Sequence, residues 1–156
     1  MRNGSLLLVS DGSYQPSLTH KRGATAWSLE CTSTSNRVSC MLGSTTSVAH
    51  AYSSKLTGIY STMAFISAVC EFYKVTAGNL KFYCDWKSGI TWVSTTYIKT
   101  APTCKHADLV HLIRQLSANT PLTISFQHIH GHQDANAIYV SLICEVKLNI
   151  ICYSIA

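Results

Sequence analysis

The chain has 156 residues, of which 47% are hydrophobic and only 12% are charged. This length and composition fit one domain that covers residues 1–156 and buries a single core. The 12 basic and 7 acidic side chains give a formal net charge of +5, which permits contact with a phosphate backbone without requiring it. No uninterrupted apolar run reaches the roughly 20 residues of a membrane span, so we expect no membrane partner.

Seven cysteines are spread along the chain, and none of them forms a Cys-x-x-Cys pair. Their number is odd and several stand inside apolar segments, which is typical of buried free thiols in an intracellular protein. The first residues also lack a charged region followed by a long apolar stretch, so we expect no secretory leader. The sequence therefore predicts a location in the cytoplasm or the nucleus.

The first half of the chain predicts three strands and a long helix. Residues 6–9 form a wholly apolar run that leads into Asp11, and residues 24–31 and 37–42 are two further strand segments separated by a polar turn. Residues 53–73 are expected to form a helix, because their apolar positions recur at helical spacing. That apolar stripe consists of Leu56, Ile59, Tyr60, Met63, Ile66, Cys70 and Tyr73.

The second half alternates between strands and helices. We predict a strand at 80–84, helices at 87–94 and 107–116, a strand at 122–130 and a last helix at 139–155. The helix at 107–116 is expected to turn Leu109, Leu112, Ile113 and Leu116 inward. This order predicts an α/β fold whose five-stranded mixed sheet combines a three-strand antiparallel meander with two parallel strands, flanked by helices.

Two aspartates stand out before any family is considered. Asp11 follows the first apolar strand and Asp85 follows the fourth. Sites in open α/β sheets form at the carboxyl ends of neighbouring strands, where two carboxylates can share a hard cation such as Mg²⁺. The alternative is that each aspartate only caps the turn or helix that follows it.

Six short motifs follow one another along the chain. They are Val-Ser-Asp-Gly-Ser at 9–13, Gly-Ala-Thr-Ala-Trp-Ser-Leu at 23–29, Ala-Tyr-Ser-Ser-Lys-Leu-Thr-Gly at 51–58, Phe-Tyr-Cys-Asp-Trp at 82–86, His-Gly-His-Gln-Asp at 130–134 and the C-terminal residues 148–156. Their order and spacing resemble type 1 ribonuclease H, especially a degenerate copy of the domain found in retrotransposon reverse-transcriptase polyproteins. This resemblance implies a ribonuclease H-like fold over roughly residues 6–156.

The resemblance also implies a mechanism. In the family, four carboxylates hold two Mg²⁺ (or Mn²⁺) ions that hydrolyse the RNA strand of an RNA/DNA hybrid, and a histidine assists. The matching residues here are Asp11 and Asp85 as metal ligands and catalytic acids, and His132 as the catalytic histidine. Asp134 is a further candidate metal ligand, although a role as a loop or helix-capping residue competes with it.

Two of the four ligand positions have lost their carboxylates. Lys55 stands where the first helix of the family carries a glutamate, and Tyr153 stands where the last helix carries an aspartate. Because an ammonium opposes the binding of a divalent ion, we predict that Lys55 pairs with Asp11 or Asp85 instead. The expected function is therefore nucleic-acid binding with impaired or no catalysis, and without a metal cofactor unless activity survives.

Other side chains suggest contacts with substrate or metal. Ser13, Trp86 and Lys87 are candidate nucleic-acid contacts, because they adjoin the two aspartates and could stack on bases or meet phosphates. His128, His130 and His132 recur at every second residue, a spacing that could chelate zinc. Structural roles for the three histidines are the alternative.

Three functions remain open from the sequence. The first is a pseudo-nuclease that binds an RNA/DNA hybrid or structured RNA. The second is an active Mg²⁺-dependent endoribonuclease that cleaves the RNA strand of hybrids. The third is a scaffold that belongs to a larger polyprotein or self-associates through its apolar C-terminal helix.

Overall fold

The computed structural model describes residues 6–15, 22–44, 50–95, 106–132 and 138–156. Its centre is a five-stranded sheet with the order β3-β2-β1-β4-β5. Strands β1 (Leu6–Gln15), β2 (Arg22–Cys31) and β3 (Arg37–Ser44) form an antiparallel meander. Strands β4 (Gly78–Cys84) and β5 (Leu122–His128) run parallel to β1, which confirms the predicted mixed sheet.

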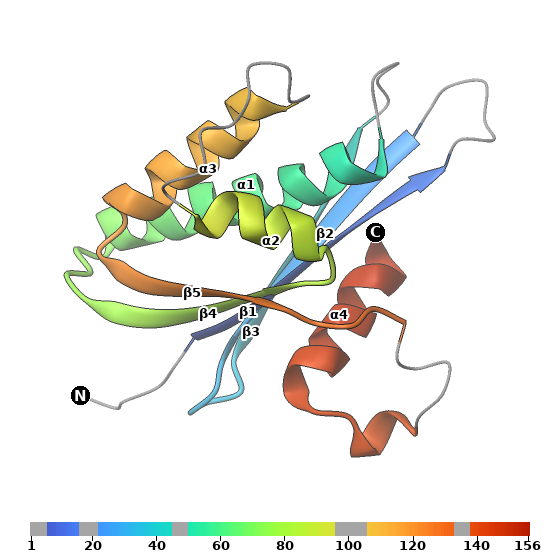
Figure 1. Ribbon diagram of the computed structural model, residues 1–156. Coiled ribbons are helices and arrows are strands. Elements are labelled where there is room, and N and C mark those ends of the chain that lie inside the picture. Colours follow the sequence, from blue (N-terminus) through green and yellow to red (C-terminus); the bar gives the residue numbers. More distant parts are fainter. Residues whose placement is uncertain (1–5, 16–21, 45–49, 96–105, 133–137) are drawn as a thin grey trace.

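Helices cover both faces of the sheet, but unequally (Figure 1). On one face, α1 (Ala51–Phe72) crosses β1 and β2, while α2 (Lys87–Ser94) and α3 (Ala107–Asn119) lie beside it. On the other face, α4 (Cys144–Ile155) packs alone against β1 and β2. None of the helices among the described residues is long and apolar enough to cross a membrane.

The central strand β1 contributes to two separate cores. Leu8 packs with the buried side chains of α1, while Leu7 and Val9 pack with α4 on the opposite face. This alternation follows from the two-residue period of a strand, and it explains why residues 6–9 are apolar without interruption. β1 is therefore fixed from both sides just before it reaches Asp11.

The predicted order of elements is correct, but several boundaries and buried positions are wrong. β1 does not end at Asp11 but continues to Gln15, because it stays paired with β2 over its whole length. In α3 the buried side chains are Val110 and Ile113, while Leu112 is 43% exposed. On α1, Tyr73 lies beyond the last helical residue and is 70% exposed instead of completing the apolar stripe.

The last helix also starts later than predicted. Residues Tyr139–Ser141 form a short 3-10 helix, η2, and α4 begins only at Cys144. Leu142 and Ile143 are extended between them, and the thiol of Cys144 donates a hydrogen bond to Glu30 at 3.3 Å. That contact ties the first residue of α4 to β2.

Candidate functional site

Strand register brings the two aspartates together. β1 and β4 are parallel, and their last paired residues are Ser10 and Cys84. Asp11 and Asp85 are the next residues along the two strands, so they lie side by side where the pairing of β1 with β4 ends. Asp11 is buried and only 4% exposed, and Asp85 is partly buried.

Two glycines let α1 approach this edge very closely. A Cβ atom on Gly12 would lie 2.6 Å from the backbone nitrogen of Lys55, which no real side chain tolerates. A Cβ atom on Gly58 would collide with the hydroxyl of Thr25, which donates a hydrogen bond at 2.9 Å to the backbone oxygen of Asp11. The absence of side chains at these positions therefore sets the depth at which α1 packs on β1 and β2.

Lys55 enters the site from the second turn of α1 and bridges both acids. Its Nζ donates to Oδ1 and Oδ2 of Asp85 at 2.5 Å and 2.6 Å, and it lies 3.4 Å from Oδ1 of Asp11. The backbone N–H of Gly12 donates to Asp11 Oδ1 at 2.7 Å. The ion pair that we predicted for Lys55 is confirmed, and it joins Lys55 to both aspartates.

Burial makes the charges of this site strongly dependent on one another. Burial raises the pKa of Asp11, and the charge of Asp85 raises it further, against the opposing effect of Lys55. Burial alone would lower the pKa of Lys55, but its hydrogen bonds with Asp85 and the charge of Asp11 raise that pKa overall. Lys55 is therefore held in its charged form between the two acids.

The donor set does not fit a divalent ion. Asp11 and Asp85 already share the ammonium of Lys55, which occupies the region between their carboxylates. Across the described parts of the chain, no group of three or more His, Cys, Asp or Glu side chains is placed to hold a metal ion. Asp134, the additional ligand suggested by the sequence, lies outside the described residues.

His132 and Tyr153 meet at the rim of the site. Their rings make an edge-to-face contact with centroids 4.6 Å apart, and Tyr153 is 50% exposed. The loop before His132 passes close to the acids, since a Cβ atom on Gly131 would lie 2.9 Å from Oδ2 of Asp85. The positions matched by resemblance to the histidine and the lost aspartate are thus neighbours in space.

The other two histidines of the predicted triplet do not join His132 in one cluster. The rings of His128 and His130 are in edge-to-face contact at 5.1 Å, and Nε2 of His128 lies 3.3 Å from the backbone oxygen of Asp85. His132 contacts Tyr153 instead. The described residues therefore give the zinc alternative no support.

The three candidate nucleic-acid contacts follow the two aspartates closely in the chain but have different surroundings. The hydroxyl of Ser13 donates to the backbone oxygen of Ala156 at 3.0 Å, which engages it at the end of α4. Lys87 is exposed at the start of α2. Trp86 is partly buried and stacks on Tyr52, with ring centroids 5.2 Å apart.

Sequence reasoning missed Tyr52. It lies in the first turn of α1, three residues before Lys55, and 60% of it is exposed. Residues three apart on a helix share a face, so the position of Lys55 could have indicated that Tyr52 borders the same site.

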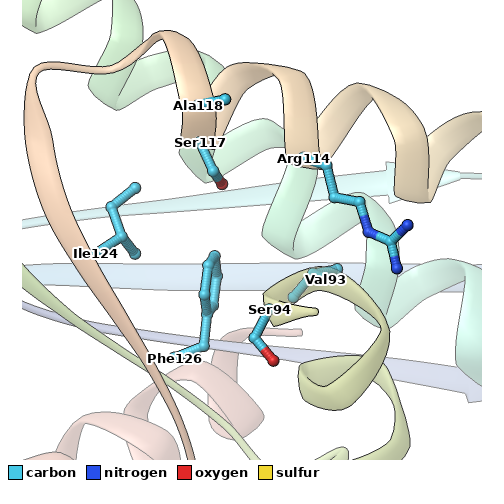
Figure 2. Close-up of a pocket in the computed structure, with 7 residues that line it drawn as sticks. All are labelled: Val93, Ser94, Arg114, Ser117, Ala118, Ile124 and Phe126. Atoms are coloured by element: carbon cyan, nitrogen blue, oxygen red, sulfur yellow. The ribbon is translucent and has the colours of Figure 1, made fainter. Parts of the chain in front are cut away.

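A separate open pocket lies between α2, α3 and β5 (Figure 2). It measures about 270 Å³, and its lining is Val93, Ser94, Arg114, Ser117, Ala118, Ile124 and Phe126. The guanidinium of Arg114 is engaged by the backbone oxygen of Trp92, which accepts hydrogen bonds from Nε and Nη2. This pocket contains none of the residues Asp11, Lys55 and Asp85.

Comparison with known proteins identifies the fold of the chain. No family model matches the chain, and no curated protein matches its sequence. Solved structures do match. The N-terminal RNase H domain of Rv2228c from Mycobacterium tuberculosis, solved as a fusion with maltose-binding protein, is 10% identical with a TM-score of 0.61, over 97% of this chain and 94% of that one.

Two further neighbours are similar. LC11-RNase H1 in complex with an RNA/DNA hybrid is 10% identical with a TM-score of 0.62, over 85% of this chain and 88% of that one. The protease–reverse transcriptase of prototype foamy virus is 17% identical with a TM-score of 0.60, over 99% of this chain and 20% of that one. Likeness at such low identity concerns the backbone, and the chain therefore has the ribonuclease H-like fold.

Proposed function

We propose that this chain is a ribonuclease H-like domain that binds an RNA/DNA hybrid or structured RNA without metal-dependent hydrolysis. The observation that carries the proposal is the ammonium of Lys55, which lies within 2.6 Å of both carboxylate oxygens of Asp85 and 3.4 Å from Asp11. Its single positive charge balances part of the negative charge that two divalent ions would balance in an active nuclease. Under this proposal the domain is a degenerate copy of an ancestral enzyme.

The net charge of the site determines whether it can bind the divalent ions that hydrolysis would require. Two carboxylates and one ammonium sum to −1, whereas a set of four carboxylates would sum to −4. An ammonium about 4 Å from a divalent ion opposes its binding by roughly 8 kcal/mol at an effective dielectric constant of about 20. Rotation of Lys55 towards solvent would relieve part of this cost, but it would also break its contacts to the buried Asp11 and the partly buried Asp85.

Several features support nucleic acid as the ligand. The formal net charge is +5, Lys87 is exposed beside the site, and Trp86 follows Asp85 directly. The structural neighbour LC11-RNase H1 was solved in complex with an RNA/DNA hybrid. The likeness to a viral protease–reverse transcriptase is in keeping with an origin in a reverse-transcriptase polyprotein.

Binding and cleavage should be measured together on labelled hybrids. We expect hybrid affinity that falls steeply with salt concentration, because contacts with phosphates release counterions. We expect no cleavage at millimolar Mg²⁺ or Mn²⁺, and cleavage to appear when Lys55→Glu and Tyr153→Asp are combined. Adding Asp11→Asn to that double variant controls for contaminating nucleases.

Two results would count against the proposal. Wild-type cleavage that Asp11→Asn abolishes would make the domain an active endoribonuclease. The absence of any salt-dependent hybrid or RNA binding would leave a scaffold role.

A further inference from the structure

A cluster of aromatic rings adjoins the ion pair on the side of α2. Tyr52 stacks on Trp86 with their centroids 5.2 Å apart and their planes 23° apart, and Trp92 meets the other part of Trp86 edge-on at 5.2 Å. A Cβ atom on Gly89 would collide with the Trp86 ring, so only glycine leaves room for this indole. Trp86 is therefore held firmly in place by its neighbours.

The outer member of this cluster faces solvent. Tyr52 is 60% exposed although its ring stacks on Trp86, so much of its surface is available to a ligand. Both rings are also tied to the site by the chain itself, because Tyr52 precedes Lys55 by one helical turn and Trp86 follows Asp85 directly. A flat ligand on Tyr52 would thus lie next to the bridged carboxylates.

The electrostatics around the rings favour an anionic strand. Lys87 is exposed immediately after Trp86, and no acidic residue stands in the first turn of α1. Asp85, which precedes Trp86 in the chain, is bonded through both oxygens to Lys55, and this ammonium offsets one of the two negative charges of the site. The ion pair that excludes metal therefore also lowers the electrostatic barrier to a nucleic-acid backbone.

We propose that Tyr52 and Trp86 form a stacking platform for an unpaired nucleobase of single-stranded nucleic acid. This inference rests on the proposed function, since it assumes that the domain binds nucleic acid, and it adds a preference for strands with unpaired bases. Aromatic side chains bind every base through its π-face, and in a duplex those faces are covered by the neighbouring base pairs. Lys87 contacts the backbone that carries the stacked base.

The test compares two oligonucleotides with the same phosphates. One is a labelled oligouridylate of about 12 nucleotides, and the other is an abasic strand of equal length. We expect the wild type to bind oligouridylate at least about fivefold more tightly than the abasic strand, with quenching of tryptophan fluorescence. Tyr52→Ala should remove that preference, and Tyr52→Phe should retain most of it.

A matched control lies near the other end of α1. Tyr73 is 70% exposed and has an edge-on contact with Phe72, so Tyr73→Ala removes a similar exposed ring far along the helix from Lys55. It should leave the preference unchanged. Because Tyr52 is on the surface, its variants should fold, and urea unfolding checks this.

The outcomes separate this inference from the proposed function. Equal affinity for the two oligonucleotides, or a preference that survives Tyr52→Ala, overturns the platform, and hybrid binding measured alongside shows whether the proposed function still stands. Failure to bind oligouridylate, abasic strand, hybrid and structured RNA at low salt overturns both the platform and the proposed function. The platform is supported if Tyr52→Ala loses the preference for oligouridylate over the abasic strand while Tyr73→Ala keeps it.

Discussion

The two faces of the sheet differ in how firmly they are covered. On the face of α1, α2 and α3, the core includes fully buried side chains from several elements, among them Leu56, Met63 and Phe82. On the other face, α4 buries a smaller cluster, and the segment that leads into it exposes Ile138 and Val140 at 78% and 80%. The acids and Lys55 depend on the first face, because α1 carries Lys55 against β1. Lys55 therefore reaches the acids from the better-packed side.

A matched pair of leucines tests this difference most strongly. Leu56 on α1 and Leu148 on α4 are both fully buried. We expect Leu56→Ala to lower the free energy of unfolding by about 4 kcal/mol and Leu148→Ala by about 2 to 3 kcal/mol, because the neighbours of Leu148 can collapse into the cavity more easily. Urea unfolding gives both values, and a larger loss for Leu148→Ala would reverse the comparison.

Removing the bridging charge should have the next largest effect. Lys55→Met keeps most of the length of the side chain but leaves Asp11 and Asp85 facing each other without a counterion. We expect it to cost about 3 kcal/mol at neutral pH, because an uncompensated buried charge is strongly destabilising. The loss should shrink in acid as Asp11 takes up a proton, because its pKa is raised by burial and by the charge of Asp85. Lys87→Met, which removes an exposed lysine, should change stability by less than about 0.5 kcal/mol.

The close approach of α1 to β1 can be broken by one methyl group. Gly12→Ala places a Cβ atom against the backbone of Ser54 and Lys55, so we expect a cost of about 2 kcal/mol and a displaced Lys55. Gly43→Ala is the control, because Gly43 lies in β3 and a Cβ atom there has nothing within 4 Å. Thermal unfolding of the two variants should separate them clearly. If Gly12→Ala and Gly43→Ala were equally stable, α1 would be able to move away from β1 without a cost in free energy.

The smallest expected effect is a pH dependence that belongs to Asp11. Its pKa is raised above the ordinary value of 3.8, so the folded protein binds this proton more readily than the unfolded chain does. Stability should therefore fall as pH rises from 3.8 through the raised pKa, and be highest below 3.8 as far as this group is concerned. Asp11→Asn should remove that part of the slope in urea unfolding measured against pH. If the free energy of unfolding of Asp11→Asn kept the same slope against pH, another group would be responsible for that slope.

Lys55 should act at the opposite end of the pH scale. Its pKa is raised above 10.5, so its contribution to stability is fully present below pH 10.5 and is lost as the pH rises through the raised value. Comparison with Lys55→Met separates this loss from the ionisation of tyrosine and cysteine side chains.

Patterns of apolar residues were sufficient to predict the order of the elements, but not their orientation in detail. In α3 both the leucines and the pair Val110 and Ile113 occur at helical spacing, and contact with α1 decides that Val110 is buried while Leu112 is exposed. The start of α4 was missed for a similar reason. Continuous apolar residues predict a helix from 139, while the extended backbone at Leu142 and Ile143 delays it to Cys144.

The candidate site likewise has one part that the sequence was sufficient to predict and another part that it was not. The pairing of Lys55 with the acids was predictable, because an ammonium beside carboxylates has few other stable arrangements. The stacking of Tyr52 on Trp86 was not, since it depends on how the first turn of α1 meets the start of α2 across the sheet edge. The roles of Ser13, Lys87 and His132 stay predictions that need functional measurements.

The most direct test of the account is a calorimetric titration with Mn²⁺. We predict that the wild type gives no binding heat at millimolar Mn²⁺, and that Lys55→Glu creates a measurable site by adding a third carboxylate beside Asp11 and Asp85. Lys87→Glu makes the same change of charge on the surface and should create none. Stoichiometric binding of Mn²⁺ to the wild type at submillimolar concentration, abolished by Asp85→Asn, would contradict the claim that Lys55 takes the place of the metals.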